Sequence, residues 1–246
     1  RPILCLLSAE LFAEPSQNVI NCACALELLH TYTLIHDDLP CMDNDDFRRG
    51  KPTCHKAFPE SIALLAGDAL LTLCFQIIAD NTKNCPEKGI RIISDLAELT
   101  GSKGVIGGQV LDIINENKPI TPEELSEIHI NKTAKLISAS VRMGAILMNA
   151  AESELEMITK YGLLIGEAFQ IADDILDEIG DSAKLGKNTG QDLKLNKSTF
   201  PKFFGIDKSK QILFDKINSA VACLNQFGKK AESLNQIAHF IGTREN

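Results

Sequence analysis

Apolar residues recur at steps of three and four along most of this 246-residue chain, and this spacing constrains the fold more than any other feature. It is the spacing of an α-helix that buries one face. No segment of convincing length shows the alternation typical of a half-buried β-strand. We therefore predict an all-α protein. Because the chain contains no fixed-period repeat and no low-complexity linker, we expect residues 1–246 to form one domain.

Capping residues and prolines indicate where the helices begin and end. Pro40 should end a helix that begins near Ser16, because a proline lacks the backbone N–H and disfavours the helical conformation of the residue before it. Thr121 followed by proline and two glutamates is a strong helix start. A loop is expected at residues 48–52. The predicted helices cover about residues 16–38, 61–79, 88–115, 121–149 and 153–179, and two more follow Lys208.

Two acidic clusters lie at the ends of apolar runs. Residues 37–46 contain five carboxylates, and residues 173–178 contain four. Carboxylates this close repel one another and raise one another's pKa unless a cation lies among them. A hard divalent cation with oxygen ligands is the usual partner of such a cluster. The clusters therefore predict two facing Mg²⁺ sites.

The geometry of each cluster leaves a simpler alternative open. Gln170, Asp173, Asp174, Asp177 and Asp181 fall in an arc of roughly 100° on a helix, which is also the pattern of a solvated polar face. No lysine or arginine interleaves them to relieve the repulsion.

In the first cluster, Asp37 and Asp38 end a helix, and a loop containing Pro40 can fold Asp43 back towards them. The alternative here is a helix terminus with an acidic loop. Acidic residues at a helix C-terminus oppose the helix dipole, so this alternative needs a positive partner.

Five basic residues provide positive charge near these clusters: Arg48, Arg49, Lys132, Lys187 and Lys197. Each alone is typical of a surface charge. Arginine presents a planar fork to phosphate oxygens, and Mg²⁺ commonly bridges carboxylates to substrate phosphates. Together with the acidic clusters, these residues indicate diphosphate chemistry.

Charge and cysteine usage exclude several classes of protein. The net charge of −8 argues against nucleic acid as a partner, since binding phosphate backbones requires a basic surface. The eight cysteines lack the regular spacing of a disulfide framework, so we expect reduced thiols and a cytoplasmic protein. A zinc site from Cys41, Cys54, His36 and His55 is disfavoured, because no C-x-x-C pair is present.

The chain contains no uninterrupted run of eighteen apolar residues and no secretory leader, so we expect no membrane span. It begins at Arg1 and Pro2 without a methionine, and we expect that an N-terminal segment is missing.

The two acidic clusters resemble the two aspartate-rich motifs of the trans-isoprenyl diphosphate synthases, most closely those of the bacterial farnesyl diphosphate synthases. Residues 36–43 read His-Asp-Asp-Leu-Pro-Cys-Met-Asp, and residues 48–53 continue with Arg-Arg-Gly-Lys-Pro-Thr. Residues 170–177 read Gln-Ile-Ala-Asp-Asp-Ile-Leu-Asp. The likeness extends from Arg1 nearly to the C-terminus. It implies a single large helical bundle around a central cavity, of the isoprenoid synthase type, and a homodimer.

The resemblance also assigns roles to individual residues. It implies that a cluster of Mg²⁺ ions, which holds an allylic diphosphate, is bound by Asp37, Asp38, Asp43, Asp173, Asp174 and Asp177. It implies that Arg48, Lys132 and Lys187 contact that diphosphate, that Arg1, His30 and Arg49 bind isopentenyl diphosphate, and that Thr133, Gln170 and Lys197 line the reacting centre. Gln109 and Asp112 match a further motif near the metals. The family precedes its R-P-x-L segment with G-G-K-x-x, which these residues lack.

The reaction implied by the resemblance joins isopentenyl diphosphate to a C5 or C10 allylic diphosphate. In related enzymes an aromatic residue at the position of Tyr32 accompanies a C15 product, farnesyl diphosphate. Geranylgeranyl diphosphate remains an alternative, since Thr33 is small. A terpene cyclase and a non-catalytic subunit of a heteromeric synthase are further alternatives. The second motif does not fit that of a cyclase. Non-catalytic subunits tend to lose one aspartate motif, whereas both motifs are intact here.

Overall fold

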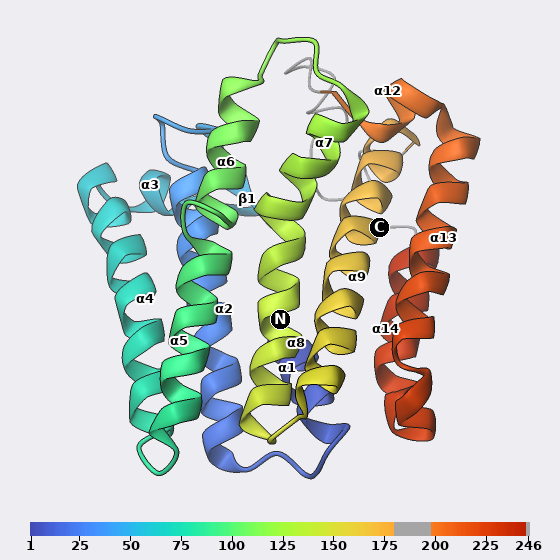
Figure 1. Ribbon diagram of the computed structural model, residues 1–246. Helices are drawn as coiled ribbons and strands as arrows, with labels where there is room; N and C mark the ends of the chain where they lie inside the picture. Colours follow the sequence, from blue (N-terminus) through green and yellow to red (C-terminus); the bar gives the residue numbers. More distant parts are fainter. Residues whose placement is uncertain (180–197, 245–246) are drawn as a thin grey trace.

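The structure is a computed structural model that describes residues 1–179 and 198–244. Long helices run roughly side by side and form a bundle (Figure 1). The fold class predicted from the spacing of apolar residues is therefore confirmed. The elements are α1 (Pro2–Glu10), α2 (Gln17–Asp37), β1 (Phe47–Arg48), β2 (Lys51–Pro52), α3 (Cys54–Ala57), α4 (Glu60–Asn81), α5 (Pro86–Thr100), α6 (Val105–Ile114), α7 (Pro122–His129), η1 (Ile130–Ala134), α8 (Lys135–Leu147), α9 (Glu152–Ile179), α12 (Phe200–Phe204), α13 (Ile206–Cys223), η2 (Asn225–Ala231) and α14 (Glu232–Thr243).

The core lies between α8, α9 and the helices packed against them. Helix α9 contacts α8 on one side and α13 on the other, while α2 packs along α4. Tyr161 of α9 is fully buried, and its hydroxyl donates a 2.7 Å hydrogen bond to the carbonyl of Leu234 in α14. This bond satisfies the only polar atom of that side chain in the interior.

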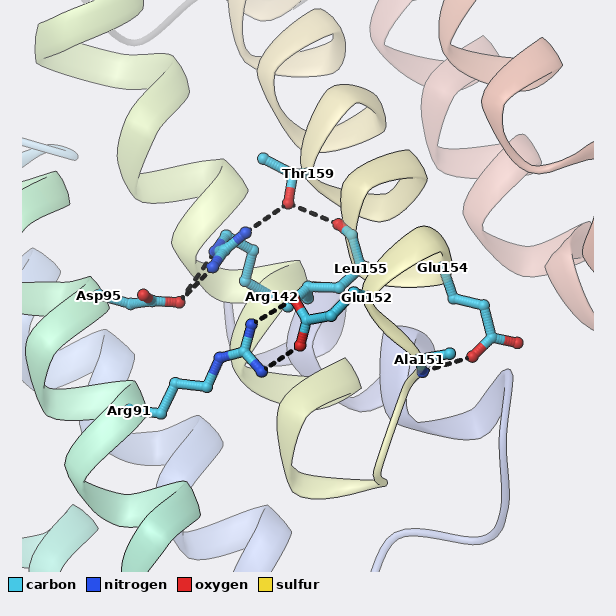
Figure 2. Close-up of polar contacts among 8 residues, drawn as sticks. All are labelled: Arg91, Asp95, Arg142, Ala151, Glu152, Glu154, Leu155 and Thr159. Atoms are coloured by element: carbon cyan, nitrogen blue, oxygen red, sulfur yellow. Dashed lines mark hydrogen bonds and ion pairs between the residues drawn. The ribbon is translucent and has the colours of Figure 1, made fainter.

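A polar network joins α5, α8 and α9 (Figure 2). Arg142 of α8 donates to Asp95 Oδ2 of α5 at 2.6 and 2.9 Å, and to Thr159 Oγ1 of α9 at 2.6 Å. Arg91 donates two bonds, of 2.6 and 2.8 Å, to the carboxylate of Glu152 at the start of α9. The paired arginine forks fix how these three helices lie against one another.

One predicted helix is divided in two. The segment 88–115 forms α5 and α6, with residues 101–104 between them. A Cβ atom at Gly104 would lie 1.8 Å from the carbonyl oxygen of Leu99, so the chain can approach itself this closely only at a glycine. The prediction of one continuous helix was wrong because it gave Gly101 and Gly104 too little weight as breaks.

The helix start at Thr121 is confirmed. The Thr121 hydroxyl accepts from the backbone N–H of Glu124 at 3.2 Å, and the Glu124 carboxylate accepts from the N–H of Thr121 at 2.7 Å. The helix continues to Leu147, but through the π-helical segment η1 rather than as one regular α-helix. Single π-turns inside helices often occur at functional sites.

Helix α4 is long and apolar enough, by length and composition, to cross a membrane; within the described ranges no other helix is. It packs against α2, while Ile62, Leu65 and Leu73 remain exposed. The expectation that the chain has no membrane span stays a prediction.

Candidate active site

The two acidic clusters lie at the same end of the bundle. Helices α2 and α9 both run upward in Figure 1, and each carries its cluster at or near its C-terminal end. Asp37 is the last residue of α2, and Asp173, Asp174 and Asp177 lie in the last two turns of α9. The chain therefore places both aspartate motifs where one ligand can approach them from the same side.

In the first cluster, a basic side chain neutralises Asp38. Asp38 is almost fully buried, and both of its oxygens accept hydrogen bonds of 2.5 to 2.9 Å from the Arg48 guanidinium. The backbone N–H of Asp43 donates to the carbonyl of Asp37 at 2.9 Å, which folds the loop back as predicted. Arg48 is thus the positive partner that two carboxylates at a helix C-terminus require.

The surroundings of Asp37 destabilise its ionised carboxylate. Burial is the largest of the causes that together raise the pKa of its carboxyl from 3.8 to about 6; Lys132 and Arg48 oppose the rise, and Asp43 and Asp38 add to it. The cost of the ionised form would fall if a cation came close.

In the second cluster, the three aspartates lie in different surroundings. Asp173 Oδ1 accepts a 2.7 Å bond from Arg244 near the end of the chain. Asp174 is almost fully buried, and its Oδ2 accepts a 2.9 Å bond from the backbone N–H of Phe200 at the start of α12. Asp177 is half-buried on α9. The predicted metal-binding roles of the six aspartates stay predictions.

No three His, Cys, Asp or Glu side chains in the described ranges converge into a group that could hold a metal ion by themselves. Mg²⁺ is usually bound through one or two carboxylates together with substrate phosphates and water, so it does not require such a group.

The π-helical segment η1 packs against α6 and against α9, the helix that carries the second cluster. Lys132 Nζ lies 2.7 Å from Asp112 Oδ2 on α6, and its charge acts on Asp37. The next residue, Thr133, donates a 3.1 Å bond to Gln170 Oε1, one turn before Asp173. Consecutive residues of η1 therefore pair with α6 and with α9, and the charge of the first of them acts on Asp37.

Two glycines allow this close packing. A Cβ atom at Gly108 of α6 would lie 2.3 Å from the backbone nitrogen of Lys132, and one at Gly166 of α9 would lie 2.4 Å from the Cα of Ala134. Backbones can approach this closely only where no side chain intervenes. These two glycines thus fix how near η1 lies to α6 and α9.

A second group of basic side chains surrounds Arg1. Burial is the main cause that lowers the pKa of Arg1 to about 10; Glu27 opposes the shift, and nearby Arg49 contributes to it. Burial, together with the charges of Arg1 and Arg49, lowers the pKa of His30 to about 3. Arg1 Nε and His30 Nδ1 are buried and have no hydrogen-bond partner. The charged guanidinium groups of Arg1 and Arg49, with the neutral His30 beside them, favour an anionic ligand.

Arg49 is held in a strained backbone conformation. It and Gly50 form the two-residue turn between β1 and β2, with φ angles of 52° and 74°. Such a turn favours glycine or asparagine at both positions, because L side chains rarely adopt positive φ. An arginine here indicates that its side chain has a role that outweighs the strain.

Tyr32 lies one and a half turns before Asp37 on α2 and is buried. Its ring meets that of His36 edge-on, with 5.5 Å between centroids. The Thr33 hydroxyl donates a 2.8 Å bond to the carbonyl of His30, so it is satisfied within the helix.

Lys187 and Lys197 lie outside the described residues. Gln109 is buried on α6, and neither atom of its amide has a hydrogen-bond partner.

Sequence reasoning missed two residues at the second cluster. Burial lowers the pKa of His129 to about 3, so its 3.9 Å approach to Asp174 is not an ion pair at neutral pH. Arg244 is separated from Asp173 by 71 residues. No local pattern could have indicated either contact, because each joins elements that only the tertiary fold brings together.

The comparisons with known proteins agree with this geometry. The family model described as polyprenyl synthetase matches residues 1–238. The chain is 45% identical to the chloroplastic geranylgeranyl pyrophosphate synthase of Catharanthus roseus, covering 100% of this chain and 70% of that protein. It is 41% identical to the farnesyl diphosphate synthase of Bacillus subtilis, over 100% of this chain and 84% of the other.

Among solved structures, the fold is similar to that of a geranyltransferase from Helicobacter pylori complexed with magnesium and isoprenyl diphosphate. The TM-score is 0.85 at 33% identity, over 98% of this chain and 83% of that one. The match over nearly the whole chain, together with both aspartate motifs at one end of an all-α bundle, shows that this protein belongs to the polyprenyl synthetase family of prenyltransferases.

Proposed function

We propose that this protein condenses isopentenyl diphosphate with a C5 or C10 allylic diphosphate and releases diphosphate, with farnesyl diphosphate as its product. The observation that carries the proposal is the arrangement of charge. Two aspartate clusters lie at one end of the bundle, the charge of Lys132 acts on Asp37 of the first cluster, and Arg1, His30 and Arg49 form a separate group. Two diphosphates need two such sites.

Mg²⁺ fits the donor set as the metal. Asp37 and Asp173 are each incompletely buried and present oxygen ligands, the type that Mg²⁺ prefers. The raised pKa of Asp37 is a further reason to expect a cation nearby. Asp38, Asp43, Asp174 and Asp177 belong to the same proposed set, although Asp38 and Asp174 already accept bonds from Arg48 and Phe200. When bound, the metal supplies positive charge for the departing diphosphate.

The basic residues of the chain act on the same leaving group. Arg48, Lys132 and Lys187 would bind the allylic diphosphate, and each such preorganised donor is typically worth about 2.7 to 4 kcal/mol in the transition state. The Asp112 carboxylate now paired with Lys132 holds that ammonium group in place until a diphosphate oxygen replaces it.

The carbon skeleton needs the opposite environment. The allylic cation is stabilised by weak dipoles in a dry, apolar pocket. Thr133 and Gln170, joined by their mutual hydrogen bond, provide such dipoles beside the second cluster, and Lys197 is proposed to act at the same reacting centre. The double bond of isopentenyl diphosphate attacks the cation, and the released diphosphate takes the proton lost from the new chain.

Tyr32 is proposed to limit product length. It lies about 7.5 Å along α2 from Asp37, by the rise of 1.5 Å per residue, and its ring is buried. Geranylgeranyl diphosphate is the second candidate product, which the 45% identity to a geranylgeranyl pyrophosphate synthase favours.

Chromatography of the products formed from isopentenyl diphosphate, a C5 or C10 primer and Mg²⁺ tests both candidates. We expect a C15 product from the wild type and longer products from Tyr32→Ala. A C20 product from the wild type would select the second candidate, and an unchanged distribution in Tyr32→Ala would reject Tyr32 as the limit.

The metal assignment is tested by Asp37→Ala and Asp173→Ala. Turnover should fall at least about 100-fold in each variant. Each loses a carboxylate that would bind Mg²⁺, and the charge of Mg²⁺ stabilises the leaving group. Asp80→Ala, on the exposed end of α4, is the matched control and should keep wild-type turnover. Near-normal activity in either cluster variant would refute the assignment. A wild type without activity would favour a non-catalytic subunit.

We further propose a cytoplasmic homodimer. All eight cysteines are free, which suits a reducing compartment. An apolar stripe along α4 is exposed, formed at helical spacing by Ile62, Leu65 and Leu73. A second copy of the chain would cover this stripe. Light scattering after gel filtration should give a dimer mass, and Leu65→Glu should yield monomers. A monomeric wild type would contradict the proposal.

A further inference from the structure

Arg244 reaches from the end of the C-terminal helix to the second aspartate cluster. Its Nη2 donates to Asp173 Oδ1 at 2.7 Å and to the backbone carbonyl of Phe169 at 3.0 Å. The guanidinium carbon also lies 4.1 Å from the centre of the Phe169 ring. Three different interactions therefore fix the Arg244 side chain beside a proposed metal ligand. The partners in all three are residues of α9.

The exposure of the two partners tells which side of the carboxylate the arginine occupies. The Arg244 side chain is 10% exposed, whereas that of Asp173 is 31% exposed. The Nε atom of Arg244 is buried. The guanidinium thus lies behind the carboxylate, against the protein, while Asp173 still reaches solvent. An arginine that blocked the ligand site would itself be the exposed member of the pair.

We propose that Arg244 is a positioning residue that holds the Asp173 carboxylate in the orientation needed to bind a divalent cation. This inference rests on the proposed function, which makes Asp173 a metal ligand. Groups that hydrogen-bond to a metal's ligands orient those ligands, and losing such a partner typically weakens metal binding by about 10 to 100-fold. The guanidinium is itself held by the Phe169 carbonyl and ring, so its bond to Asp173 Oδ1 has a fixed direction that the flexible ammonium group of lysine would not give.

This position also connects the C-terminal helix to the site. Helix α14 packs against α9 and α13, so Arg244 can reach Asp173 only when that packing is complete. The orientation of one ligand therefore depends on the last helix of the chain.

Mn²⁺ titrations followed by electron paramagnetic resonance, with inorganic diphosphate present, test the proposal without measuring turnover. Arg244→Ala should weaken Mn²⁺ binding by about 10 to 100-fold, and Arg244→Lys should weaken it less. Arg91→Ala is the matched control, because Arg91 also donates two bonds to a carboxylate (Figure 2), but that carboxylate belongs to Glu152, at the opposite end of α9 from Asp173. It should stay within twofold of the wild type.

A double variant distinguishes positioning from a separate effect. If Arg244 acts through Asp173, adding Arg244→Ala to Asp173→Asn should cause no further loss of Mn²⁺ binding. Circular dichroism checks that each variant is folded, and if Arg244→Ala is not, Arg244→Gln takes its place.

Unchanged or tighter Mn²⁺ binding in Arg244→Ala would overturn the proposal, as would additive losses in the double variant. If the wild type transfers prenyl groups while these results are negative, only the role of Arg244 fails. A wild type that neither binds Mn²⁺ nor turns over would remove the proposed function as well.

Discussion

Replacing Asp37 with asparagine should stabilise the metal-free protein at neutral pH while it removes prenyl transfer. Burial, reinforced by Asp43 and Asp38, raises the pKa of Asp37 from 3.8 to about 6. One pKa unit corresponds to about 1.36 kcal/mol. The ionised carboxylate therefore lowers the free energy of unfolding by up to about 3 kcal/mol above pH 6.

The pH dependence follows from which state binds the proton more tightly. The folded protein holds the Asp37 proton more tightly than the unfolded chain does, so stability falls as the pH rises from about 4 to about 6 and is then constant. Asparagine has no charge to bury. The gain from Asp37→Asn should reach about 1 to 3 kcal/mol at pH 8 and about a third of that at pH 4.5.

Urea unfolding of wild type and variant, with EDTA at both pH values, measures this difference. Glu98→Gln, which changes an exposed carboxylate on α5, is the control and should show no gain that grows with pH. Equal gains at the two pH values, or a variant less stable than wild type at pH 8, would refute the reasoning that Asp37 is strained by burial.

Two further predictions concern backbone geometry. Gly166→Ala should lower the free energy of unfolding by about 1 to 3 kcal/mol in urea titrations, because the new Cβ would lie 2.4 Å from the Cα of Ala134. Gly242→Ala, whose Cβ would meet its nearest atom at 3.4 Å, should instead be neutral or stabilising by up to about 1 kcal/mol, and equal losses at both sites would contradict the argument. Arg49→Gly should raise the unfolding free energy by about 1 kcal/mol, since it relieves a positive φ, and should raise KM for isopentenyl diphosphate in steady-state kinetics. A destabilised Arg49→Gly protein would show that the turn is not strained.

Most of the helices could be predicted from the sequence, because a helix that buries one face repeats its apolar residues locally. The exceptions are places where the backbone departs from that repeat. The break at Gly104 depends on a close approach to Leu99, and the hairpin around Arg49 is too short to produce a strand pattern. The π-turn at η1 keeps the apolar spacing on either side, so the segment still resembled one long helix.

The candidate site divides in the same way. Both aspartate motifs are contiguous in the sequence and could be recognised there. The motifs do not indicate which groups form hydrogen bonds with each carboxylate. The burial of Asp174 against Phe200 and the contact of Arg244 with Asp173 join residues 26 and 71 positions apart. Such pairs depend on the packing of α12 and α14, which no local pattern encodes.

The π-turn at η1 makes segment length, and not only composition, a constraint on this protein. A π-turn holds one residue more than the α-helical turn it replaces. Deleting a single residue between Ile130 and Ala134 would let an ordinary α-helix form with α7 and α8 in nearly the same relative rotation, but the turn would then offer one side-chain position fewer. The hydrogen bond of Thr133 to Gln170 and the ion pair of Lys132 with Asp112 could then not form together. Single-residue deletions here should be tolerated far less than substitutions.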